Sequence, residues 1–141
     1  MVNAVQHTLE QIDKHPHLKI YIGTDSQSYT KETVYVTAIV YRYGNRGCHY
    51  IFHKEKLPRV KSDYFRLYDE GVRTISTFDS LTKEIPVSIE ALEFDYQEVL
   101  STISNKLVKD FRGWVSGLPV KAIFKSGQMI AAKAADHIIR H

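Results

Sequence analysis

The chain has 141 residues, of which 43% are hydrophobic, and its 19 Lys and Arg against 16 Asp and Glu leave a formal net charge of +3. This length and composition allow one hydrophobic core, so we expect a single domain over residues 1–141. The weak positive charge permits a polyanionic partner without requiring one. A lone Cys48 excludes an internal disulfide and a cysteine-based metal cage, and no apolar run is long enough to span a bilayer, so the sequence predicts a cytoplasmic protein with no membrane partner.

The first half of the chain predicts a short helix followed by three antiparallel strands. Apolar residues at helical spacing between Val5 and Ile12 predict the helix, which Pro16 interrupts. Three runs rich in β-branched and aromatic residues predict the strands, over residues 18–24, 33–41 and 48–54. A turn rich in glycine over residues 44–47 joins the last two strands, which favours a meander.

The second half predicts strands that alternate with helices. Ser62 is expected to cap a long helix that Pro86 ends, because apolar residues recur between them at helical spacing. The elements that follow are a strand over 87–94, a helix that Gly113 stops, a strand over 120–124 and an alanine-rich helix over 128–140 capped by Ser126. The order β-β-β-α-β-α-β-α predicts an α/β fold, a mixed five-stranded sheet with helices on its faces.

Four acids fall where this arrangement would bring them together. Asp25 ends the first strand and Asp95 ends the fourth, while Glu70 and Asp136 lie on the first and third long helices. Two-metal phosphoryl transfer needs several carboxylate oxygens at one point, because two Mg²⁺ ions about 3.5–4 Å apart must be held with positions left open for water and phosphate. The pattern therefore predicts one acidic metal site.

Three of these acids have a structural alternative that depends on their local sequence. Asp25 can begin a polar turn, since Asp hydrogen-bonds its own backbone there. Asp95 can cap the helix that follows it. Asp136 lies close to Lys133 and Arg140 on its helix, so an intrahelical ion pair on a solvated face is the alternative to metal binding.

Glu70 has its own alternatives, which follow from its helix. It lies at the shoulder of the apolar stripe, whereas Asp69 is expected to face solvent. Gly71 lies within the stripe and permits close approach to the sheet. The competing interpretation is a surface ion pair between Glu70 and Arg66 or Arg73.

The histidines and the nucleotide-binding motifs add little. The seven histidines lack metal-binding spacings, and four in strand or loop segments are expected to be exposed: His15, His17, His49 and His53. His137 can assist proton transfer or simply lie exposed. The sequence has no P-loop, GxGxxG or GxSxG motif, which excludes the corresponding hydrolase and dinucleotide-binding classes.

Short motifs in four places carry a resemblance to a known family. They are Gly23-Thr24-Asp25-Ser26-Gln27, Glu70 with Thr74 one turn later, Phe94-Asp95, and the segment from Lys125 to Ala135-Asp136. On these motifs, which span most of the chain, it resembles the ribonuclease H-like YkuK family. Glu93 and Ser126 differ from the family pattern, which has His and Pro there. A further negative charge at Glu93 would change metal affinity and nearby pKa values.

The resemblance implies a ribonuclease H-like fold with an acidic catalytic and metal site formed by Asp25, Glu70, Asp95 and Asp136. We expect a nuclease that uses two Mg²⁺ or Mn²⁺ ions to cleave RNA, an RNA/DNA hybrid or structured DNA. Lys125 is expected to contact a phosphate, and Ser26 and Gln27 to orient a ligand or substrate. The alternative is a catalytically weak nucleic-acid-binding or protein-interaction module that retains the fold, and metal binding distinguishes the two.

Overall fold

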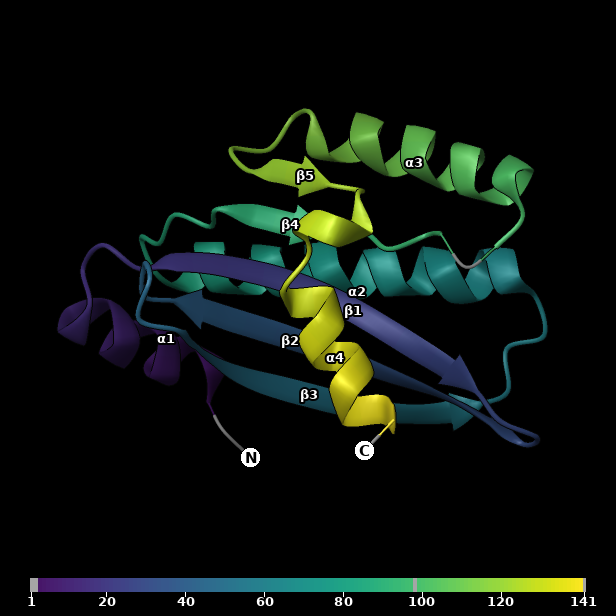
Figure 1. The fold of residues 1–141 in the computed structure, drawn as a ribbon, viewed down its shortest axis with the longest axis horizontal. Helices are drawn as coiled ribbons and strands as arrows, with labels where there is room; N and C mark the ends of the chain where they lie inside the picture. Colours follow the sequence, from purple (N-terminus) through teal and green to yellow (C-terminus); the bar gives the residue numbers. More distant parts are fainter. Residues whose placement is uncertain (1–2, 98, 141) are drawn as a thin grey trace.

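The centre of the fold is a five-stranded sheet in the order β3-β2-β1-β4-β5 (Figure 1). The computed structural model of the chain describes residues 3–97 and 99–140. The strands are β1 (Lys19–Ser28), β2 (Glu32–Arg42), β3 (Cys48–Pro58), β4 (Ala91–Glu93) and β5 (Lys121–Ile123). The helices are α1 (Ala4–Lys14), α2 (Asp63–Glu84), α3 (Ser101–Val115) and α4 (Ala131–Arg140), with a 3₁₀ helix η1 (Ser126–Gln128) before α4. Within this part of the chain no helix combines the length and apolarity needed to cross a membrane.

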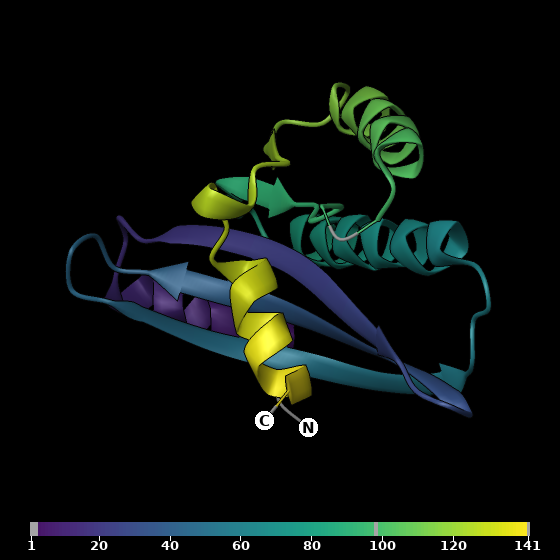
Figure 2. The ribbon, with the colours of Figure 1, turned by 45° about the vertical axis from the view of Figure 1, so that its right-hand side comes forward.

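The predicted mixed sheet is confirmed. The strands β1, β2 and β3 form an antiparallel meander, β4 pairs with β1 in parallel, and β5 pairs with β4 in parallel. The turn between β2 and β3 contains Gly44 and Gly47, both with positive φ, which glycine adopts without strain. Helices cover both faces: Figures 1 and 2 show α4 on one side of the sheet and α1 and α2 on the other.

Alternation along β1 decides which side chain meets which helix. Ile20 and Ile22 pack into the main core under α2, whereas Tyr21 packs against Ala131 of α4 on the other face. A side chain on Gly23 would collide with α4, since its Cβ would lie 2.8 Å from the backbone nitrogen of Ala132. Glycine at this position therefore lets α4 lie directly on β1.

The expectation that Asp25 closes the first strand is wrong. The strand β1 continues to Ser28, and Asp25 pairs with Val36 of β2. Residues 26–28, expected to form a turn, remain in the ladder because β2 offers backbone partners along the whole edge. The turn lies over residues 29–31 instead, where the Tyr29 N–H donates to the Glu32 carbonyl at 2.7 Å.

The long helix α2 begins and ends as expected. The Ser62 hydroxyl accepts the Phe65 N–H at 3.3 Å, and the helix stops before Pro86. The expectation for Gly71 was wrong in its partner, because the close approach is to α3 and not to the sheet. A Cβ there would overlap the Phe111 ring.

Several element ends differ from the sequence-based expectation. The fourth strand is only Ala91–Glu93, and the fifth is Lys121–Ile123. The helix α3 continues through Gly113 to Val115, so that glycine does not stop it. Asp95 does not cap α3, which begins at Ser101 after a chain segment that separates the two.

The start of the last helix was also predicted wrongly. Ser126 lies in η1, and α4 begins at Ala131. The Ser126 hydroxyl donates to the Gln97 side chain at 3.0 Å and does not cap α4. The acceptor for the first N–H groups of α4 comes from β4, in the side chain of Glu93.

Candidate active site

Two of the predicted acids follow the paired part of β1 and β4, Asp25 within β1 and Asp95 just past the end of β4. The parallel register pairs Gly23 of β1 with Glu93 of β4, and Asp25 and Asp95 each lie two residues further along. Both side chains are half-buried. Because β4 ends at Glu93 while β1 continues, the edge of β1 beside Asp25 has no strand partner among the described residues. The two acids therefore flank an open edge of the sheet.

Asp136 lies on α4, the helix that packs over β1 and β2. The preceding residue, Ala135, packs in one cluster with Val36, the residue that pairs with Asp25 across the β1–β2 ladder. Asp25 shares the α4 face of β1 with Gly23 by strand alternation. The Arg140 Nε donates a hydrogen bond to the Asp136 carboxylate at 2.6 Å, so the expected intrahelical ion pair is present.

Glu70 lies on α2 and meets β1 from the face opposite α4. Its carboxylate accepts a hydrogen bond from the Ser26 hydroxyl, and Arg66 donates to the same hydroxyl at 2.7 Å. The Arg66 guanidinium also lies 3.7 Å from the Glu70 carboxylate. Glu70 is 2% exposed, so the ion pair expected on the surface is buried.

Asp69, which precedes Glu70 on α2, does not face solvent as expected. Asp69 is half-buried and accepts a hydrogen bond from the Tyr35 hydroxyl at 3.2 Å. Burial raises the pKa of Tyr35, and the negative charge of Asp69 raises it further. The turn of α2 that carries Glu70 is thus held to the sheet by polar contacts on both sides.

Glu93 stands between the strands and α4. Its carboxylate is 1% exposed and accepts the N–H of Ile130 at 3.1 Å and of Ala132 at 2.9 Å. Burial raises the pKa of Glu93, while the backbone donors and Lys133 oppose that shift. Since its oxygens are occupied by the helix start, Glu93 anchors α4 beside the acids.

The three expected substrate contacts lie in different surroundings. Ser26 is 4% exposed and its hydroxyl bridges Arg66 and Glu70, so it positions Glu70. Gln27 is half-buried at the next position of β1. Lys125 is exposed immediately before η1.

The donor chemistry of this edge suits a hard divalent cation, but the four acids are not assembled into one coordination shell. Asp25 and Asp95 supply carboxylate oxygens, the ligands that Mg²⁺ and Mn²⁺ prefer. Within residues 3–97 and 99–140 no group of three or more His, Cys, Asp or Glu is placed to hold a metal ion. Asp136 would have to leave Arg140, and Glu70 its buried partners, to join such a shell.

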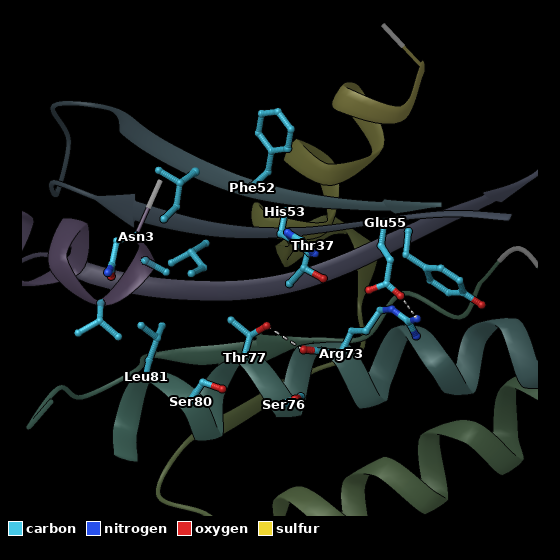
Figure 3. A pocket seen from close by; sticks show the side chains of 15 residues that line it. Asn3, Thr37, Phe52, His53, Glu55, Arg73, Ser76, Thr77, Ser80 and Leu81 are labelled. Atoms are coloured by element: carbon cyan, nitrogen blue, oxygen red, sulfur yellow. Dashed lines mark hydrogen bonds and ion pairs between the residues drawn. The ribbon is translucent and has the colours of Figure 1, made fainter. Parts of the chain in front are cut away.

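A separate cavity of about 500 Å³ opens on the α2 face, between α1, α2 and the β2–β3 hairpin (Figure 3). At one end Arg73 pairs with Glu55 at 2.6 Å and lies over the Tyr35 ring. Thr37 and His53 point into it from the sheet (Figure 3). Asp25 faces the opposite side of the sheet, so this cavity is not part of the acidic edge.

His15, His17, His49 and His53 are exposed, as expected, and so is His137 on α4.

A comparison of the sequence with known protein families gives one match that covers nearly the whole chain. The sequence matches the Ribonuclease H-like family over residues 1–140. The chain belongs to the ribonuclease H-like family. A comparison with curated proteins gives no match.

Two solved structures share low similarity with this ribonuclease H-like chain. One is the RuvC structure of Thermus thermophilus, with 14% identity, a TM-score of 0.40, and coverage of 74% of this chain and 63% of that one. The other is RNase H1 of Halobacterium salinarum NRC-1, with 11% identity, a TM-score of 0.40, and coverage of 84% and 92%.

Sequence reasoning missed the partners that surround the acids. The Arg66–Glu70 pair was visible as an i, i+4 spacing, but its burial depends on β1 and could not be inferred from α2 alone. The contact between Glu93 and the start of α4 joins residues about forty positions apart and leaves no local signal. Both contacts are tertiary, and both decide how the acids are presented.

Proposed function

We propose that this domain is a metal-dependent nuclease that hydrolyses phosphodiester bonds at the open edge of β1. The observation that supports it most is the parallel pairing of Gly23 with Glu93 in a ribonuclease H-like chain, since Asp25 and Asp95 each follow this pair by two residues. We further propose that the chain belongs to the YkuK group of this family, on the motifs around Asp25, Glu70 and Asp136.

The residues divide into ligands and positioning groups. Asp25 and Asp95 would hold a divalent cation, with Asp136 and Glu70 joining from the two helices. Bound there, Mg²⁺ or Mn²⁺ would polarise the phosphate and lower the pKa of an attacking water. Ser26 holds Glu70 in place.

Two further residues complete the proposal by contacting nucleic acid. Gln27 lies two residues after Asp25 on β1, and the exposed Lys125 can neutralise a phosphate. A phosphate contact of this kind positions the strand without reading its sequence. The substrate classes are RNA, an RNA/DNA hybrid and structured DNA.

The test is cleavage of labelled single-stranded RNA, an RNA/DNA hybrid and a DNA hairpin with Mg²⁺ or Mn²⁺. We expect Asp25→Asn and Asp95→Asn to lose activity by about a hundredfold or more, since each removes charge that the transition state needs. Asp79→Asn is the matched control, because Asp79 is exposed on α2 away from the edge, and it should cleave like the wild type. Near-normal cleavage by Asp25→Asn, or no cleavage by the wild type with either metal, would contradict the proposal.

A further inference from the structure

The outer strand β3 sorts its side chains by face. Four residues alternate on the face of the sheet that carries α4, and together they are named the β3 track: Tyr50, Phe52, Lys54 and Lys56. Their face follows from the register, since Phe52 pairs with Ala38 and Lys54 pairs with Val36, two residues packed under α4. Figure 3 shows Phe52 on the opposite side of the sheet from His53.

The β3 track is open to solvent and carries positive charge alone. Phe52 is 52% exposed and Tyr50 39% exposed, and both lysines are exposed. Among the described residues neither lysine forms an ion pair, and β3 has no acid on this face. Its one acid, Glu55, lies on the other face and pairs with Arg73. Two free ammonium groups beside two exposed rings match a partner that has both negative charge and flat apolar groups.

The β3 track is aligned with the acidic edge. Lys54 pairs with Val36 and Val36 pairs with Asp25, so the three residues form one line across the sheet on the α4 face. Two strand spacings separate Lys54 from Asp25, about 10 Å. A nucleic-acid strand advances about 3.4 Å per stacked nucleotide, so the two positions are about three nucleotides apart.

We propose that the β3 track binds a single-stranded segment of nucleic acid, with its phosphates on Lys54 and Lys56 and its bases stacked on Tyr50 and Phe52. The base faces of a duplex are covered by their neighbours, so stacking on exposed rings requires unpaired bases. The inference rests on the proposed function, because it places a strand so that a phosphate about three nucleotides away lies at Asp25.

The test measures binding in EDTA, where no metal-dependent cleavage occurs. The probes are fluorescent 12-nucleotide oligo-U, oligo-dT and a 12-base-pair duplex, each titrated over a range of salt concentrations. The salt slope is the slope of the logarithm of the binding constant against the logarithm of the salt concentration. Loss of two phosphate contacts in the Lys54→Ala/Lys56→Ala variant should reduce its magnitude by about 1.4, since each contact on a single strand contributes about 0.7. The matched control is Lys83→Ala/Lys109→Ala, which removes the same charge from exposed positions on α2 and α3 and should keep the wild-type slope.

A second variant tests the stacking separately from the charge. Phe52→Leu keeps an apolar side chain but removes the ring, and we expect it to weaken single-strand binding between about fivefold and a hundredfold. Its effect on the salt slope should be small, because no charge is lost. Comparison of oligo-U with oligo-dT shows whether the β3 track distinguishes RNA from DNA.

Three results would overturn the inference: no binding by the wild type, tighter binding of the duplex than of single strands, or equal salt slopes for the track variant and its control. The proposed function can fail independently. Binding that depends on the β3 track, without cleavage when Mg²⁺ or Mn²⁺ is added, would contradict the proposed nuclease function and leave the binding inference intact. If a track variant cleaves its substrate and also binds nucleic acid like its control, the result would contradict the binding inference and leave the nuclease proposal intact.

Discussion

At the scale of single residues, buried carboxylates determine how the acidic edge is built. Glu93 is nearly inaccessible and accepts the first N–H groups of α4. A carboxylate is favourable there, because the N-terminus of a helix carries partial positive charge. The sequence alone suggests an additional charge at the metal site, whereas in the structure the Glu93 carboxylate anchors the helix that carries Asp136.

The anchor predicts a loss of stability on truncation. Glu93→Ala leaves the N–H groups of Ile130 and Ala132 without their acceptor, so we expect the free energy of unfolding to fall by about 1–3 kcal/mol. Glu93→Gln retains an acceptor oxygen and should cost less. Urea denaturation at neutral pH measures both variants, and equal stability of Glu93→Ala and the wild type would show that the contact contributes nothing.

The buried ion pair between Arg66 and Glu70 on α2 leads to a second prediction at this scale. Arg66→Ala leaves the carboxylate of Glu70 without its facing guanidinium, and we expect a loss of about 3–5 kcal/mol in unfolding free energy. Arg46→Ala, in the exposed β2–β3 turn, is the control and should change stability by less than about 0.5 kcal/mol. Denaturation without metal compares them, and matching losses would contradict a structural role for the pair.

At the scale of elements, α2 fits along β1 because one turn of the helix and two residues of the strand advance by similar distances. Glu70 and Thr74 are one turn apart on α2, about 6 Å, and meet Ser26 and Thr24, two residues apart on β1, about 6.8 Å. The motif that carried the family resemblance therefore has a physical reason. The pair of contacts could not be predicted from either element alone, since the register of the helix on the strand is a tertiary property.

The contact between α1 and β3 predicts a pH dependence. The Nε2 atoms of His7 and His49 lie 2.8 Å apart, so one ring must be neutral to accept the hydrogen bond. Burial lowers the pKa of His49, and the nearby His7 lowers it further. The unfolded chain then binds more protons than the folded one between the folded pKa and about 6.5, so stability rises with pH across that interval.

Acid should therefore weaken the docking of α1. The contribution of this contact is complete above about pH 6.5 and is lost as the pH falls through the folded pKa of His49. Thermal denaturation between pH 5 and 8 measures it, and His49→Gln should show a shallower pH dependence than His53→Gln, a control on the same strand. The same slope in both variants would exclude this histidine pair as the cause.

At the scale of the whole molecule, the order of elements follows from local patterns while their ends do not. Apolar alternation and helical periodicity predicted the mixed sheet, and the Ser62 cap was recognised from its own segment. The end of β1 depends on β2, and the start of α4 depends on Glu93, so neither boundary has a local signal. The four acids could be proposed as a site from the order of the strands and helices, and that site stays a prediction, whereas the hydrogen-bond partners of Glu70 depend on the assembled fold.

The central claim is that the edge of β1 is a divalent-metal site, and calorimetric titration of the protein with Mn²⁺ tests it most directly. The wild type should bind two ions saturably, and Asp25→Asn should lose at least one of them, because it removes a charged oxygen that we propose as a metal ligand. Asp79→Asn should bind like the wild type. Absence of saturable binding by the wild type, or unchanged binding by Asp25→Asn, would contradict the account.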